Sequence, residues 1–123
     1  MNTRLMALVG ALLALSVAAV IVGRQRAASP EALKETAVRM MREGRGAEAI
    51  PILADAVSRK PNFAEGYQAL GVAYGIVGDE AASEACLERA IALKPEYPLA
   101  VFNLAAIRER QGRHVVGEGP EQV

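Results

Sequence analysis

The chain has 123 residues, and its 14 basic residues balance its 14 acidic ones, so no overall charge attracts it to nucleic acid. A single cysteine excludes an internal disulfide, a single histidine excludes a histidine-rich metal site, and the absence of tryptophan argues against an aromatic platform for stacking bases. With 52% apolar residues, the composition suits one small domain of packed helices.

The first predicted element is an apolar helix over residues 5–23, which follows a short tail of residues 1–4. Its 19 residues carry no charge, and a helix of this length spans roughly 30 Å, the thickness of a bilayer core. The sequence therefore predicts a single transmembrane helix that acts as a signal anchor in a bacterial inner or cell membrane. Arg4 precedes this helix, while Arg24 and Arg26 follow it, and this charge bias favours a cytoplasmic location for the rest of the chain.

A cleaved secretory signal is the alternative, and it would make the protein secreted or periplasmic. Residues 5–15 would then be the apolar core, with a small-residue cleavage site at 16–18 or 17–19. The apolar run continues to Arg24, which favours a retained anchor. Small residues also recur along the helix at spacings of three and four, a pattern that lets another membrane helix approach closely, although alanine is common in apolar helices in any case. They are Ala7, Gly10, Ala11, Ala14 and Ala18.

After a polar linker over residues 24–29, two consecutive stretches share a pattern of 34 residues. We refer to residues 30–63 as the first unit and to residues 64–97 as the second unit. Small residues, leucines and prolines coincide between the units in the pairs Ala37 and Gly71, Gly44 and Gly78, Leu53 and Leu87, Ala56 and Ala90, and Pro61 and Pro95. A repeat of this length is typical of stacked helix pairs, so we expect an all-α fold.

Helix-capping residues mark where the helices of each unit should begin. Ser29 before a proline predicts the start of the first unit, and its second helix is expected over residues 47–59. Asn62 followed by Glu65 resembles a capping box at the start of the second unit, and Asp79 is the expected cap of its second helix.

A third unit begins at residue 98 and is expected to be incomplete. Residues 98–113 predict a capping helix, because Gly112 aligns with the turn glycines of the first two units. Residues 114–123 carry no helical pattern and are expected to be a flexible tail, which includes His114. Arg108 stands where the other units have Met40 and Tyr74, as suits an outer face with nothing to pack against.

These matches at fixed positions resemble the tetratricopeptide repeat family from residue 30 to about residue 113. The resemblance is clearest in the second unit, at Tyr67, Leu70, Gly71, Tyr74, Gly78, Leu87, Ala90 and Pro95. It implies a right-handed superhelix of antiparallel helix pairs, with two full repeats and a capping helix. It also implies a concave groove, lined by the first helix of each pair, that holds a peptide or helix of another protein.

The family register assigns a set of residues to this groove. Several apolar ones would form its floor and several charged ones its rim, where Glu109 would join them, although some of the apolar residues could instead pack against the linker or the tail. The assigned residues are Lys34, Val38, Met41, Arg42, Gln68, Ala69, Val72, Ile76, Phe102, Asn103, Ala106 and Arg110.

One branch of the family binds the acidic tails of heat-shock chaperones with a clamp of lysine, asparagine and arginine side chains. Lys34 fits the first clamp position. Val38, Ala69 and Leu99 replace an asparagine, an asparagine and a lysine, and Asn103 replaces the arginine. A doubly charged carboxylate would be left unpaired without those donors, so we do not expect this ligand.

No motif in the chain predicts an enzyme or a cofactor. The glycines of residues 71–78 lack a preceding strand and a following lysine with serine or threonine, and Cys86 has no histidine near it in the sequence. The sequence therefore predicts a membrane-anchored adaptor or scaffold that binds a protein partner, with a structural accessory subunit of a membrane complex as the alternative. Because two repeats make a small core, a homodimer or a place in such a complex would add stability.

Overall fold

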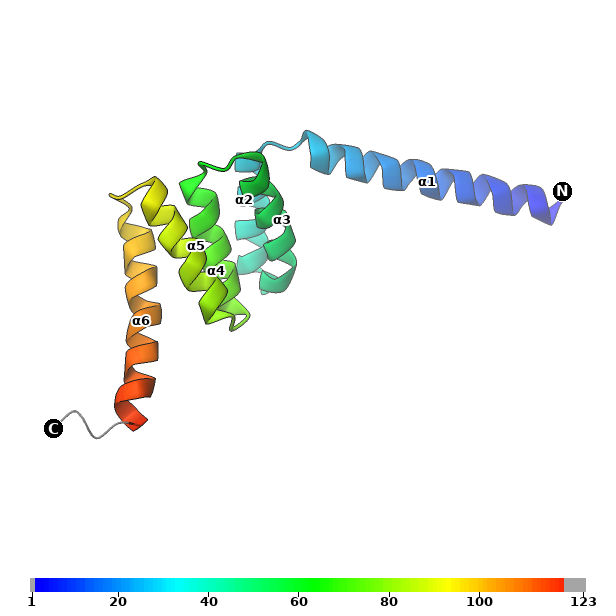
Figure 1. Cartoon of the computed structure of the whole chain (residues 1–123). Helices are drawn as coiled ribbons and strands as arrows, with labels where there is room; N and C mark the ends of the chain where they lie inside the picture. The colour runs from blue at the N-terminus through cyan, green and yellow to red at the C-terminus, as the bar shows by residue number, and fades with distance from the viewer. Residues whose placement is uncertain (1, 119–123) are drawn as a thin grey trace.

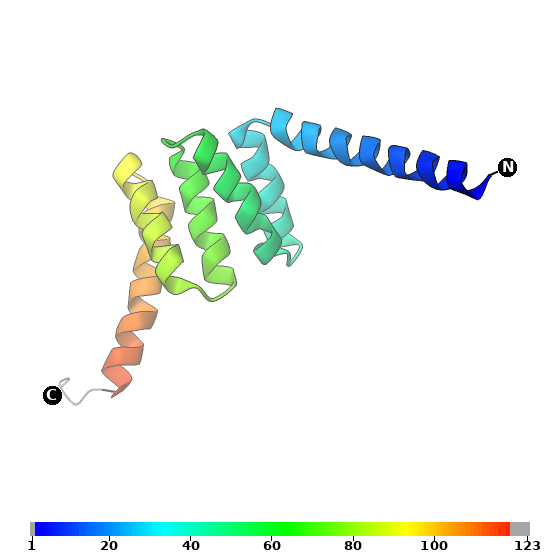
Figure 2. The same cartoon turned by 45° about the vertical axis from the view of Figure 1, so that its right-hand side comes forward.

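The computed structural model describes the backbone of residues 2–118 and the side chains of residues 2–16 and 28–112. Over residues 2–118 the chain forms six α-helices and no strand. Helices α2 to α6 pack one after another as a stack of antiparallel helices, while α1 extends away from one end of the stack and α6 forms the other end (Figures 1 and 2). The helices are α1 (Thr3–Ala27), α2 (Pro30–Arg42), α3 (Gly46–Arg59), α4 (Ala64–Ile76), α5 (Glu80–Leu93) and α6 (Pro98–Glu118).

Two of the predicted helix caps are confirmed, and one is wrong. The side chain of Ser29 accepts a hydrogen bond from the Ala32 amide at 3.1 Å, and Asp79 accepts one from the Ala82 amide at 3.1 Å. Asn62 does not cap α4, which begins after Phe63 without a side-chain cap. The reason is packing, because the ring of Phe63 is buried against the first unit and holds the start of the helix at that point.

Glycine turns join the two helices within each complete unit, as predicted. Gly44 and Gly78 have φ angles of +80° and +86°, a conformation that residues with a Cβ rarely adopt. In both turns the next residue reaches back over the end of the preceding helix. The Arg45 amide donates to the Met40 carbonyl at 2.8 Å, and the Asp79 amide donates to the Tyr74 carbonyl at 3.0 Å. These bonds satisfy carbonyls that the helix end would otherwise leave unpaired.

The core runs along the stack between the helices of each unit. Leu53 of α3 and Leu87 of α5 are fully buried at equivalent positions. Close approach of α4 and α5 depends on Gly71, because a Cβ added there would lie 2.8 Å from the Leu87 Cγ atom and 3.2 Å from the Ser83 carbonyl oxygen. The buried Ser83 hydroxyl uses this approach to donate to the Gly71 carbonyl at 2.6 Å.

A lysine closes each complete unit in the same way. Lys94 pairs with Glu65 across the second unit at 3.2 Å, and its ammonium lies 4.7 Å from the centre of the Tyr97 ring. Lys60 pairs with Glu31 in the first unit, and its ammonium lies 4.8 Å from the ring centre of Phe63. The start of the first helix and the end of the second helix are therefore joined in both units.

The third unit differs from the prediction at its end. Helix α6 passes through Gly112, which does not adopt the positive φ of the other two turn glycines, and continues to Glu118. Five residues of the predicted tail are thus helical, while residues 119–123 and the side chain of His114 lie outside the described part of the structure. A glycine is tolerated in a helix at a cost of about 1 kcal/mol, so Gly112 alone does not end α6.

Helix α1 covers the predicted transmembrane segment, but the prediction of an anchor is not supported. Nowhere in the part of the chain that the structure describes does a helix combine the length and the apolar character needed to cross a membrane. The described side chains of α1 end at Ser16, short of the roughly 20 residues that a span requires. Single-pass topology over residues 5–23 is corrected accordingly.

All side chains described on α1, from Asn2 to Ser16, are exposed. The predicted stripe of small residues is exposed with them, and a Cβ built on Gly10 would meet nothing within 4 Å. The stripe therefore contacts no neighbouring element at this position. Its last member, Ala18, and the two alternative cleavage sites extend beyond the residues whose side chains are described.

Candidate functional site

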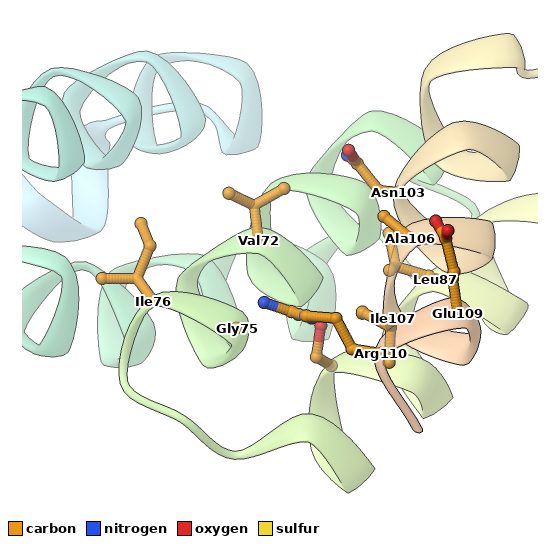
Figure 3. A pocket seen from close by; sticks show the side chains of 10 residues that line it. Val72, Gly75, Ile76, Leu87, Asn103, Ala106, Ile107, Glu109 and Arg110 are labelled. Atoms are coloured by element: carbon orange, nitrogen blue, oxygen red, sulfur yellow. The ribbon is translucent and has the colours of Figure 1, made fainter. Parts of the chain in front are cut away.

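A pocket of about 510 Å³ opens between α4 and α6, the first helices of the second and third units. Figure 3 shows Val72 and Ile76 on the α4 side, with Asn103, Ala106 and Arg110 facing them from α6. The complete lining is Val72, Gly75, Ile76, Ser83, Leu87, Asn103, Ala106, Ile107, Glu109 and Arg110.

The floor of this pocket is apolar because of the way that α4 and α6 rest on α5. Leu87 and Ser83 of α5 and Ile107 of α6 are buried, and they close the bottom of the pocket. Gly75 leaves this floor uncovered, since a Cβ added to it would stand 3.5 Å from the Ser83 hydroxyl oxygen. The missing side chain thus gives the pocket its depth.

The rim of the pocket is polar and charged. The Arg110 side chain extends from α6 toward Gly75 (Figure 3), and its Nε atom lies 3.5 Å from the Oε1 atom of Glu80. Both side chains are partly exposed, so this pair is weak and can open. An apolar floor with a charged rim suits an apolar side chain presented by a helix or an extended segment.

Five of the twelve residues predicted for the groove line this pocket, namely Val72, Ile76, Asn103, Ala106 and Arg110. Phe102 is 70% exposed on α6 but is not part of the pocket lining. The remaining predicted residues belong to α2 or to the buried part of α4.

Two predicted groove residues on α4 are buried instead of lining the surface. Gln68 is 9% exposed and Ala69 is 3% exposed, and Ala69 belongs to the core between the first and second units. The prediction that they offer contact surface is corrected, because α2 and α3 cover that side of α4.

On α2 the predicted residues do not form a pocket with those of α6. Val38 and Met41 are partly buried and pack against the same core as Ala69. Lys34 pairs with Glu35 at 3.0 Å, while Arg42 is exposed at the end of α2.

Three lining residues were not predicted, namely Ser83, Leu87 and Ile107. All three occupy core positions of the repeat pattern, so their residue types indicate burial and not a binding surface. The available signal was Gly75, which falls at a groove position and has no side chain to cover what lies beneath it.

Ile76 connects this pocket to the joint between the first and second units. Its side chain is 55% exposed, and a Cβ added to Gly46 would lie 2.8 Å from the Ile76 Cγ2 atom. Ile76 therefore rests directly on the first residue of α3 while also forming one edge of the pocket.

Chemical reactivity near the pocket is low at the one cysteine. Burial raises the pKa of the Cys86 thiol, and the Asp79 carboxylate raises that pKa further. A thiol with a raised pKa remains protonated at neutral pH and is a poor nucleophile. Among the described residues, no three histidine, cysteine, aspartate or glutamate side chains are grouped so that they could hold a metal ion.

Sequence comparison identifies one part of the chain. A search of curated proteins found no match. Residues 64–97, by contrast, match the sequence profile of the tetratricopeptide repeat. The match has the same limits as the second unit. A tetratricopeptide repeat is thus found at residues 64–97, where it comprises α4, α5 and the turn between them.

Proposed function

We propose that this protein is a protein-protein interaction module whose pocket between α4 and α6 receives an apolar side chain from a helix or peptide of a partner. The repeat at residues 64–97 supports the general role, since such repeats commonly mediate protein-protein interactions. The observation that carries the proposal is the open pocket floored by Leu87 and Ile107 and rimmed by Arg110.

The size and surroundings of the pocket support a side chain as its ligand. Its volume of about 510 Å³ falls within the range of roughly 300–1,000 Å³ that is typical of ligand sites. The exposed ring of Phe102 extends the apolar surface along the same helix, beyond the pocket itself. A partner segment can therefore place one apolar residue in the pocket and a second against Phe102.

The exposed apolar residues of α1 favour a second candidate function. Leu5, Leu12 and Leu15 are each more than half exposed, as are several of their neighbours. Contiguous apolar surface of this kind marks a site of association. In this second proposal the protein is an accessory subunit of a larger complex, and α1 makes the contact.

A selection from phage-displayed random peptides of 16 residues tests the groove. The full chain, kept monodisperse with a mild detergent because α1 is apolar, is the immobilised target. We expect peptides with spaced apolar residues to be enriched, and a selected peptide to lose at least tenfold in affinity against Ile76→Asp or Phe102→Asp. A carboxylate in this apolar surface would be desolvated by the bound peptide without a partner.

Val77→Asp is the matched control, because Val77 is the next residue after Ile76, is also exposed and is not part of the lining. Equal loss in the control and in Ile76→Asp would contradict a specific pocket, as would a selection that enriches no peptide. For the second candidate, Leu12→Asp should release proteins that co-purify with the full chain, whereas the groove variants should retain them.

A further inference from the structure

A second pocket, of about 660 Å³, lies between α5 and the opposite face of α6. No residue of this pocket lines the groove pocket. We call it the open face of α6, and its lining is Glu88, Ile91, Val101, Leu104, Ala105 and Arg108.

The same face of the first helix is covered in the two complete units. In the second unit α5 packs on α4 at Gly71, where the backbones approach most closely. In the first unit α3 packs on α2, and Ala37 at the equivalent position is fully buried. Ala105 holds this position in the third unit, and it is exposed.

The open face is uncovered because α6 does not turn. Gly44 and Gly78 reverse the chain and bring the second helix of each unit back onto the first. Helix α6 continues straight through Gly112 to Glu118 instead. Within residues 2–118, therefore, no helix occupies the place that α3 and α5 fill in their units.

The composition of the open face differs from that of a solvent-facing cap. Terminal elements of a repeat stack need a polar outer face to stay soluble. Val101 is 47% exposed here, and Ala105 is exposed beside it. Arg108 is the polar exception, and its guanidinium bonds to Glu84 at 3.1 Å and to Glu88 at 2.9 Å at one edge of the face.

The helices that cover the equivalent faces show what fits there. Each presents a small residue, then a leucine four positions later, then an alanine three positions after that. These residues are Ala49, Leu53 and Ala56 in α3, and Ser83, Leu87 and Ala90 in α5, and all six are buried. The leucine fills the space beside the small residue of the first helix, and the flanking small residues allow close contact.

We propose that the open face of α6 binds a helix of another protein that carries this spacing of small residue, leucine and alanine. The bound helix extends the stack by one layer, in continuity with the packing of α3 on α2 and of α5 on α4. A polar side chain of the partner faces Arg108, where the complete units have Met40 and Tyr74. This surface is separate from the groove, so a partner can bind here whether or not the groove is occupied.

A peptide copied from α5 is a suitable probe, because α5 already covers the equivalent face of α4. A fluorescein-labelled peptide of residues 79–94, made with Cys86→Ser, is titrated into the full chain and followed by fluorescence anisotropy. We expect saturable binding, and a loss of at least tenfold in affinity for the Ala105→Leu chain. The larger side chain would occupy the line along which the two helix backbones approach.

Ala105→Leu should fold normally because Ala105 is exposed, and an unchanged thermal unfolding midpoint verifies this. Ala85→Leu is the matched control, since Ala85 is an exposed alanine of α5 that lines neither pocket. A peptide that also carries Leu87→Asp should not bind.

Three results would overturn the proposal. The first is the absence of binding by the peptide, and the second is equal binding by the Ala105→Leu chain. The third is self-association of the chain in sedimentation that Ala105→Leu abolishes, which would make a second copy the occupant of the open face.

Discussion

Helices α4 and α6 hold the same position in successive units, and they differ in what covers them. Helix α4 is packed on both sides, by α3 of the first unit and α5 of its own unit. Helix α6 packs against α5 and presents apolar residues on its open face. The comparison teaches that burial in a repeat is decided by neighbouring units, because equivalent residues such as Gly71 and Ala105 have opposite exposure.

Placing the same large side chain at these two equivalent positions should give the largest effect. In Gly71→Leu the new Cβ would meet the Leu87 side chain and the Ser83 backbone, neither of which can move far in a packed core. We expect a loss of about 3 kcal/mol or more in the free energy of unfolding. Ala105→Leu should change that free energy by less than about 0.5 kcal/mol, as is usual for exposed positions. Urea titrations monitored by circular dichroism measure both values, and similar losses would contradict the difference in packing.

A smaller effect, of opposite sign in the two units, is expected at the equivalent glycines. Gly78→Ala forces a residue with a Cβ into a positive φ and should cost about 1 kcal/mol. Gly112→Ala should stabilise α6 by about 0.5–1 kcal/mol, since Gly112 is helical and a Cβ there meets nothing within 4 Å. Thermal unfolding of the two variants tests this, and a destabilised Gly112→Ala would mean that α6 ends earlier than Glu118.

The smallest effect concerns the lysine that closes the second unit, because in the third unit Leu99 replaces the equivalent glutamate. Lys94→Met should cost less than about 1 kcal/mol at neutral pH, as expected for an exposed ion pair and an exposed contact with an aromatic ring. Hydrogen bonding to its own amide and then to Lys94 lowers the pKa of Glu65. This stabilisation is present above the pKa of the unfolded state and is lost as the pH falls through the lower, folded-state pKa.

Urea titrations of the wild type and Lys94→Met between pH 7 and pH 3 test this linkage. The difference between the two proteins should shrink as Glu65 becomes protonated at the acidic end. A difference that stays constant over this range would assign the effect of Lys94 to its ring contact with Tyr97 alone.

Much of the repeat architecture could be predicted from the sequence because its signals are local. Ser29 and Asp79 bond to amides three residues away, and Gly44 and Gly78 adopt the conformation that their turns require. Such features depend on a few neighbouring residues and little on the rest of the fold.

The division between groove and core could not be predicted in the same way. Ala69 and Val72 are both apolar and both follow the groove register, yet Ala69 is buried by the first unit and Val72 reaches the pocket. That outcome depends on how far α4 is rotated relative to α2 and α3. The length of α6 was missed for a related reason, because a glycine ends a helix only when the following chain packs back against it.

Ile76 gives the pocket a mechanical consequence. Its side chain forms an edge of the pocket and also rests against Gly46, at the start of α3. A ligand that pushes on Ile76 therefore applies force to the hinge between the first two helix pairs. Occupancy of the pocket can then alter the curvature of the whole stack, so that the angle between its layers reports on the presence of a ligand.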